Sequence, residues 1–123
     1  FDLEQEGQDM LAVRQMERAL LIRCRDEVDE ACVAAAERLV VKCNTVAVKA
    51  FKNDDFSAAT ILLDNAVRLT EDGSLPFVNS ESLRIQLRGT TFNNYGCMER
   101  RRGQLQVALR FLMMSVDLGG QRS

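Results

Sequence analysis

The sequence contains no histidine, no tryptophan, one proline and only seven glycines in 123 residues. Without histidine, zinc sites that mix cysteine with histidine are excluded, and the four cysteines form no CxxC pair. The commonest general base is missing as well, and no glycine-rich phosphate loop is present. We therefore expect no enzyme activity, no metal or other cofactor, and no small-molecule substrate.

Long apolar runs are also missing. Runs such as 19–22 and 39–41 are only a few residues long, whereas a membrane-spanning helix needs about 20. Sixteen basic residues against eighteen acidic ones give a net charge of −2, so the surface as a whole does not attract nucleic acid. With 46% hydrophobic and 28% charged residues, the composition is that of a globular chain. We expect neither a membrane nor a nucleic acid as partner.

Three of the four cysteines are spaced for one face of a helix. Cys24, Cys32 and Cys43 lie 8 and 11 residues apart, close to whole helical turns, and Cys97 stands alone. We interpret all four as reduced thiols in the core, which places the protein in the cytoplasm or another reducing compartment, with the cytoskeleton as one setting. Because the chain starts at Phe1 and not at Met, we expect it to be a fragment of a larger protein.

Helices are the expected secondary structure throughout. No glycine or proline occurs between Gly7 and Gly73, so the residues that usually end strands and form turns are missing. Capping residues then indicate where helices end: Asp26 or Asp29, the acidic pair Asp54-Asp55, Glu71-Asp72 with Gly73 and Pro76, Gly103, and finally Gly119-Gly120. Five helices are predicted, over 8–24, 28–52, 56–69, 80–102 and 104–118. The carboxylate pairs are interpreted as turn and cap residues.

Three of these segments repeat one pattern, over 12–22, 59–69 and 108–118. Each has a small residue (Ala12, Ala59, Ala108), a large apolar residue four positions later, and another small residue three further on (Ala19, Ala66, Ser115). A turn-forming residue, Gly7, Asp54 or Gly103, precedes each segment by five positions. The segments start 47 and 49 residues apart, which indicates an internal structural repeat.

The pattern resembles the tetratricopeptide repeat, in which small residues let two antiparallel helices approach closely. The last pair carries the best match, with Phe92, Tyr95 and Gly96 on its first helix, Gly103 at the turn and Ala108 beyond; the middle pair has Cys43, Val46, Ala47 and Ala59. The resemblance implies a single all-α domain, 1–123, of antiparallel helix pairs stacked as a short right-handed solenoid. It divides into a partial repeat (1–25), two pairs (28–70 and 80–118) and a polar tail (119–123). The family period is usually about 34, so the first helices are lengthened here. An ordinary helical bundle is the alternative.

A stack of this kind implies a groove for a partner's peptide or helix, lined by the first helix of each pair. We expect the solvent-facing residues of those helices to line it: Asn44, Val48, Lys49, Arg84, Arg88, Thr91, Asn94 and Arg101. Members of the family that bind chaperones hold a terminal carboxylate with lysines and asparagines. Only Asn94 fits that clamp, because Asn44 and Val48 stand where a lysine and an asparagine would be needed.

Two further features bear on partners. Arg100-Arg101-Arg102 suits phosphate or an acidic partner, although cations at a helix C-terminus are stabilised by the helix dipole without any ligand. Wide apolar faces at 20–22, 40–41 and 111–114 indicate contact with a neighbouring repeat or with a second copy of the chain. We therefore predict a scaffold or adaptor module that binds a protein or peptide. A self-assembling, homodimeric structural module is the alternative.

Overall fold

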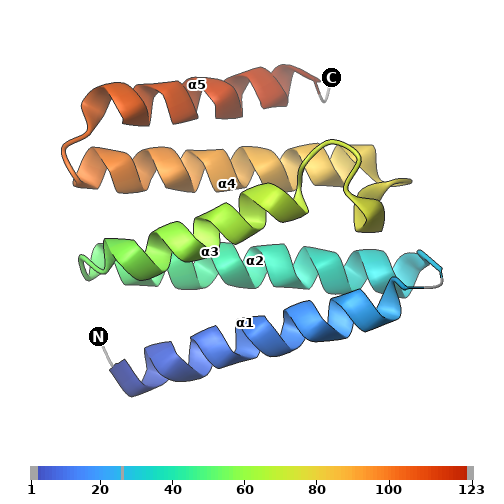
Figure 1. The fold of residues 1–123 in the computed structure, drawn as a ribbon. Helices are drawn as coiled ribbons and strands as arrows, with labels where there is room; N and C mark the ends of the chain where they lie inside the picture. Colours follow the sequence, from blue (N-terminus) through green and yellow to red (C-terminus); the bar gives the residue numbers. More distant parts are fainter. Residues whose placement is uncertain (1–2, 26, 122–123) are drawn as a thin grey trace.

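A computed structural model describes residues 3–25 and 27–121, and within them the chain is all-α with no strand. Five α-helices and one 3₁₀ turn follow each other: α1 (Leu3–Arg23), α2 (Glu30–Lys52), α3 (Phe56–Leu69), η1 (Leu75–Phe77), α4 (Glu81–Arg101) and α5 (Leu105–Gln121). Successive helices pack antiparallel, with α1 and α5 at opposite edges of the molecule and α2 and α4 between them (Figure 1). The prediction of an all-α chain with five helices in antiparallel contact is thus confirmed for the described residues.

The turns form where the capping residues predict them. The Asp29 side chain accepts a 2.9 Å hydrogen bond from the Cys32 amide and begins α2, and Asp55 begins α3 in the same way by accepting from the Ala58 amide at 3.2 Å. Gly103 has a φ of 81° between α4 and α5, a conformation in which a side chain would be strained. Asp26, the other candidate cap, lies outside the described residues.

Two predicted helix ends are wrong. Helix α1 starts at Leu3 and runs through Gly7, and α5 continues through Gly119-Gly120 to Gln121. Glycine lowers helix propensity by only about 1 kcal/mol, so it permits an end without imposing one. Within the described residues, no helix is both long and apolar enough to cross a membrane.

The core lies where α2, α3 and α4 meet. Fully buried side chains come from all three helices and from η1, whose Phe77 closes one end: Leu39, Val40, Cys43, Leu62, Leu63, Phe77 and Met98. Small residues let the helices approach, since Ala47, Ala59 and Ala66 are completely buried. The core thus extends continuously from one helix pair into the next.

Helices α4 and α5 lie in close contact at Gly96. A Cβ there would lie 2.7 Å from Leu112 Cγ and 3.1 Å from the carbonyl oxygen of Ala108. On the same side, the Phe111 ring stacks on Tyr95 and Phe92, with centroids 4.3 and 6.0 Å apart. The lack of a side chain at Gly96 lets α4 and α5 come close together, and the stacked rings of Phe92, Tyr95 and Phe111 stabilise their contact.

Helix α1 does not repeat this arrangement, and the predicted roles of Ala12 and Ala19 are wrong. Ala12 is half-buried and Ala19 is exposed, while Val13 and Leu20 are 2% and 5% exposed. The backbone of α1 lies close to that of α2 and to that of no other described helix, so α1 has one main buried face, and the larger side chains of Val13 and Leu20 occupy it. Of the three segments that share the sequence pattern, only those in α3 and α5 keep the first small residue, Ala59 or Ala108, buried.

Candidate functional site

An open groove of about 430 Å³ lies between α2 and α4. Four of the residues predicted to line a groove, Asn44, Val48, Lys49 and Asn94, lie on its wall, and two aliphatic residues and two threonines complete it. The complete lining is Val41, Asn44, Thr45, Val48, Lys49, Leu87, Thr90 and Asn94. The groove therefore combines apolar surface with a few polar groups, as ligand-binding sites commonly do.

Hydrogen bonds between carboxamide and hydroxyl groups join the two walls. Asn44 Nδ2 donates to Thr91 Oγ1 at 3.0 Å and to the Val40 carbonyl at 3.0 Å, and Asn94 Nδ2 donates to Asn44 Oδ1 at 2.8 Å. Asn44 is 6% exposed and Thr91 is fully buried, so the expectation that both face solvent is wrong. Polar residues on a helix face can bond to a neighbouring helix instead of water, and here they fix α2 against α4.

Two predicted groove residues, Arg84 and Arg88, lie away from the groove and end helix α3. Arg84 Nη1 donates to the carbonyl of Thr70 at 2.9 Å, and Arg88 Nη1 donates to that of Val67 at 2.8 Å. Arg84 is only 6% exposed, so the expectation that it is solvent-facing is wrong. The Arg88 guanidinium lies 4.9 Å from the Phe92 ring centroid, and burial lowers its pKa. The last carbonyls of a helix lack partners within it, and these cations satisfy them.

Arg101 binds at the opposite end of α3, where the turn between α2 and α3 lies. Its Nε donates to Asp54 Oδ1 at 3.1 Å and its Nη2 to the carbonyl of Lys52 at 3.0 Å. Asp54 has a φ of 64°, a left-handed conformation that asparagine and aspartate tolerate best. The side chain predicted to meet a partner is thus already bonded to the turn between α2 and α3.

A buried carboxylate absent from the sequence-based predictions lies beside Lys49. Asp9 of α1 is 6% exposed, and its carboxylate lies 3.3 Å from Lys42 Nζ and 3.9 Å from Lys49 Nζ. Its position four residues before Val13 on the buried face of α1 was the available signal. The pair of lysines anchors α1 to α2.

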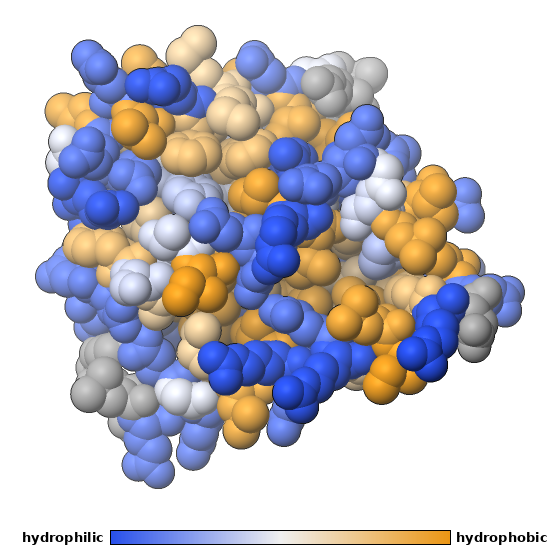
Figure 2. Space-filling view, in the orientation of Figure 1, coloured by the Kyte–Doolittle hydropathy of each residue, from blue (hydrophilic) through white to orange (hydrophobic). Residues whose placement is uncertain are grey.

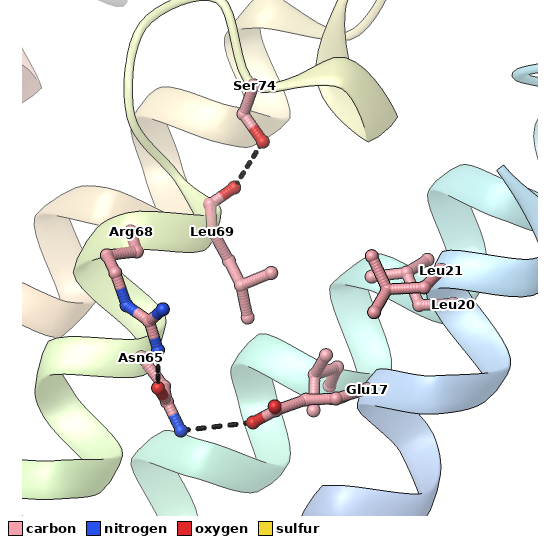
Figure 3. A pocket seen from close by; sticks show the side chains of 8 residues that line it. Glu17, Leu20, Leu21, Asn65, Arg68, Leu69 and Ser74 are labelled. Atoms are coloured by element: carbon pink, nitrogen blue, oxygen red, sulfur yellow. Dashed lines mark hydrogen bonds between the residues drawn. The ribbon is translucent and has the colours of Figure 1, made fainter. Parts of the chain in front are cut away.

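A second cavity, of about 250 Å³, opens between α1 and α3 over α2 (Figure 3). Leu20, Leu21 and Leu69 point into it, and Figure 2 shows hydrophobic surface in the same region. At its polar edge Asn65 bridges two charges, since its Nδ2 donates to Glu17 at 3.0 Å and its Oδ1 accepts from Arg68. No sequence pattern predicted this cavity, because α1 and α3 become neighbours only in the folded chain, where both pack on α2 and Asn65 bonds to Glu17.

The cysteines do not form one set of core thiols, and that prediction is wrong. Cys24, in the turn directly after α1, and Cys32, in the first turn of α2, are joined by a disulfide, with their Cα atoms 6.0 Å apart. Cys43 is buried, which raises the pKa of its thiol to about 12, and Cys97 is exposed. A disulfide points to an oxidising environment, in contrast to the predicted reducing compartment.

Acidic and cysteine side chains do not gather elsewhere into a set suited to a metal ion, as far as residues 3–25 and 27–121 are concerned. The arrangement that the structure offers is therefore a groove with apolar walls and a carboxamide pair. Comparisons with protein-family models, with curated proteins and with solved structures gave no match for this chain.

Proposed function

We propose that this chain is a protein-interaction module of the tetratricopeptide type that holds a partner's peptide in the groove between α2 and α4. The observation that carries the proposal is the Asn94 carboxamide, which stands half-buried between the apolar side chains of Val41, Val48 and Leu87. A polar group with unused bonding capacity, set within apolar walls, is suited to recognising a peptide backbone.

The hydrogen bonds around Asn94 define what it offers a ligand. Its Nδ2 donates to Asn44, whereas its Oδ1 accepts no hydrogen bond from the described part of the chain. A carboxamide has two donor hydrogens and two acceptor lone pairs, so Asn94 can accept from a backbone amide and donate to a backbone carbonyl together. Because Asn44 fixes its orientation, little conformational entropy is lost on binding.

Charge at the edge of the groove adds a preference. The side chain of Lys49 is 57% exposed and lies at 3.9 Å from Asp9, so its ammonium is only partly neutralised. An acidic residue in the ligand would gain from Lys49, with a small contribution because the site is open to water. The ligand that fits best is an extended segment with alternating aliphatic and polar residues and an acidic residue toward Lys49.

The helix contacts support the repeat assignment. Helix α2 packs on α3 and on α4, α3 packs on α4, and α4 packs on α5. In a stack of helix pairs, each first helix meets its own second helix and the first helix of the next pair, and α2 and α4 have these neighbours. Their groove then corresponds to the inner face where partners bind in such stacks.

Selection of peptides from a displayed random library against this chain tests the proposal. We expect enriched sequences whose binding falls at least about tenfold with Val41→Glu and with Asn94→Ala, since tenfold corresponds to about 1.4 kcal/mol. Ile61→Glu is the matched control, because Ile61 is 53% exposed on α3 and Val41 is 49% exposed on α2. Selected peptides that bind the Val41→Glu variant as tightly as the parent chain would place the binding site elsewhere.

A further inference from the structure

Helix α5 carries an apolar stripe that nothing in the described chain covers. Leu105, Leu109, Met113 and Val116 are 65%, 58%, 57% and 74% exposed. They follow each other at intervals of four, four and three residues and so lie along one side of the helix. Among the described helices α5 contacts α4 alone, and it forms one edge of the molecule (Figure 1), where Figure 2 shows exposed hydrophobic surface.

Two charges of opposite sign flank this stripe on the same side. Arg110 and Asp117 are seven residues apart, which is two turns less about 20°, so they share one flank of α5. Both are exposed, and neither forms an ion pair or a hydrogen bond within the described residues. This differs from Arg84, Arg88 and Arg101, whose guanidinium groups are all bonded within the chain.

We propose that α5 forms an antiparallel homodimer contact with α5 of a second copy. A two-fold axis perpendicular to two antiparallel helices keeps the same flank on the same side of the interface. Arg110 of each copy then faces Asp117 of the other, twice over, and the stripe of one copy covers the stripe of the other. A parallel pair would instead place the two charged flanks on opposite sides of the interface and leave the charges unpaired.

The charge pairing also fixes the register. If Arg110 lies level with Asp117 of the other copy, the two-fold axis passes between positions 113 and 114. Met113 of one copy then meets Met113 of the other, and Leu109 packs beside Val116. The hollow between Leu109, Leu112 and Val116 can accept a partner side chain, and the unbranched methionines adapt to the fit. One helix pair is small for an interface, so the dimer is of about micromolar affinity or weaker.

Sedimentation equilibrium tests this contact, in a Cys97→Ser background because Cys97 is exposed and would otherwise cross-link copies. From about 5 μM to about 1 mM we expect a shift from the chain mass of 13.8 kDa to twice that mass. Met113→Glu abolishes the shift. A chain that stays monomeric over the whole range, or a dimer that survives Met113→Glu, overturns the proposal.

A charge swap tests the antiparallel register separately. Arg110→Asp alone places two acidic pairs across the interface, and Asp117→Arg alone places two basic pairs, so each weakens the dimer at least about fivefold. The double variant with both substitutions restores parental affinity. Arg14→Asp, at an exposed position of α1, is the control with the same change of charge as Arg110→Asp and leaves dimerisation unchanged. A double variant as weak as the single variants contradicts the antiparallel register.

The groove between α2 and α4 takes no part in this contact, so a failure of the dimer proposal leaves the proposed function untouched.

Discussion

The guanidinium of Arg84 ends helix α3: its Nη1 donates a 2.9 Å hydrogen bond to the carbonyl oxygen of Thr70, the residue that caps the helix. The same guanidinium bonds to Glu81 at 2.9 Å and lies 3.7 Å from Asp72, although Arg84 itself is only 6% exposed. A buried cation is stable only when it is paired and hydrogen-bonded, and these contacts meet both conditions.

Replacing Arg84 by methionine keeps the apolar stem and removes the guanidinium. We expect the free energy of unfolding to fall by about 1–3 kcal/mol, because the Thr70 carbonyl loses a charged donor in a buried place. Urea denaturation followed by circular dichroism measures this difference. Arg110→Met is the matched control and changes stability by less than about 0.5 kcal/mol when measured at monomeric concentration, since Arg110 is exposed. An equal effect of the two substitutions would mean that the Thr70 bond adds nothing.

Arg84 also shows why the helices can be predicted from the sequence more readily than the contacts of their polar side chains. Capping residues such as Asp55 and Gly103 act locally, and the helices they delimit were predicted within a few residues. The hydrogen-bond partner of a long polar side chain depends on which helix end packs opposite it. The local sequence does not encode that packing. The sequence pattern therefore predicts solvent-facing positions for Arg84 and Thr91, whereas the structure buries both. Similarly, Cys24 and Cys32 read as one stripe, but the break between α1 and α2 turns the chain back and joins them.

Gly96 is predicted to tolerate no side chain. In Gly96→Ala the new Cβ would lie 2.7 Å from Leu112 Cγ and 3.1 Å from the backbone oxygen of Ala108, so α4 and α5 must separate. We expect a loss of about 1–3 kcal/mol in spite of the better helix propensity of alanine.

Gly89, on the same helix, provides the matched control. A Cβ there would lie 3.8 Å from the Ser115 carbonyl oxygen, an ordinary contact, so Gly89→Ala should stabilise the chain by about 0.5–1 kcal/mol. Thermal melts of the two variants should therefore move in opposite directions. Equal stabilisation by both alanines would show that α4 and α5 are not in close contact at Gly96.

The disulfide between Cys24 and Cys32 makes a prediction about thiol counts. Iodoacetamide applied to the unreduced, denatured chain should modify Cys43 and Cys97 alone, and all four cysteines after reduction. In the native state only Cys97 should react, because Cys43 is buried and the pKa of its thiol is raised to about 12. Intact mass spectrometry reads all three counts.

The same disulfide closes a loop of 8 residues, which predicts its effect on stability. Restricting the unfolded chain over so short a loop stabilises the native state by about 2–3 kcal/mol. The double variant Cys24→Ser with Cys32→Ser should lose that amount in urea denaturation, whereas Cys97→Ser should change stability by less than about 0.5 kcal/mol. If iodoacetamide modified all four cysteines of the denatured chain without prior reduction, Cys24 and Cys32 would be free thiols, and neither prediction for the disulfide would hold.

Two carboxyl groups meet where α1 passes the turn before α3, and their contact predicts a dependence of stability on pH. A side-chain hydrogen bond with Asp55 raises the pKa of Glu6 from 4.5 to about 6. Since the native state holds this proton more tightly than the unfolded chain, the contribution to stability is complete below about pH 4.5 and disappears as the pH rises through 6.

Glu6→Gln carries a permanent donor in the same place and removes this dependence. The variant should be more stable than the parent chain at pH 7, by less than about 1 kcal/mol because water screens the pair, and should equal it at pH 4. Glu27→Gln, at an exposed carboxylate, is the control. Thermal melts across this range decide the matter: a difference between parent and Glu6→Gln that grows toward low pH would mean that the two carboxyl groups do not share a proton.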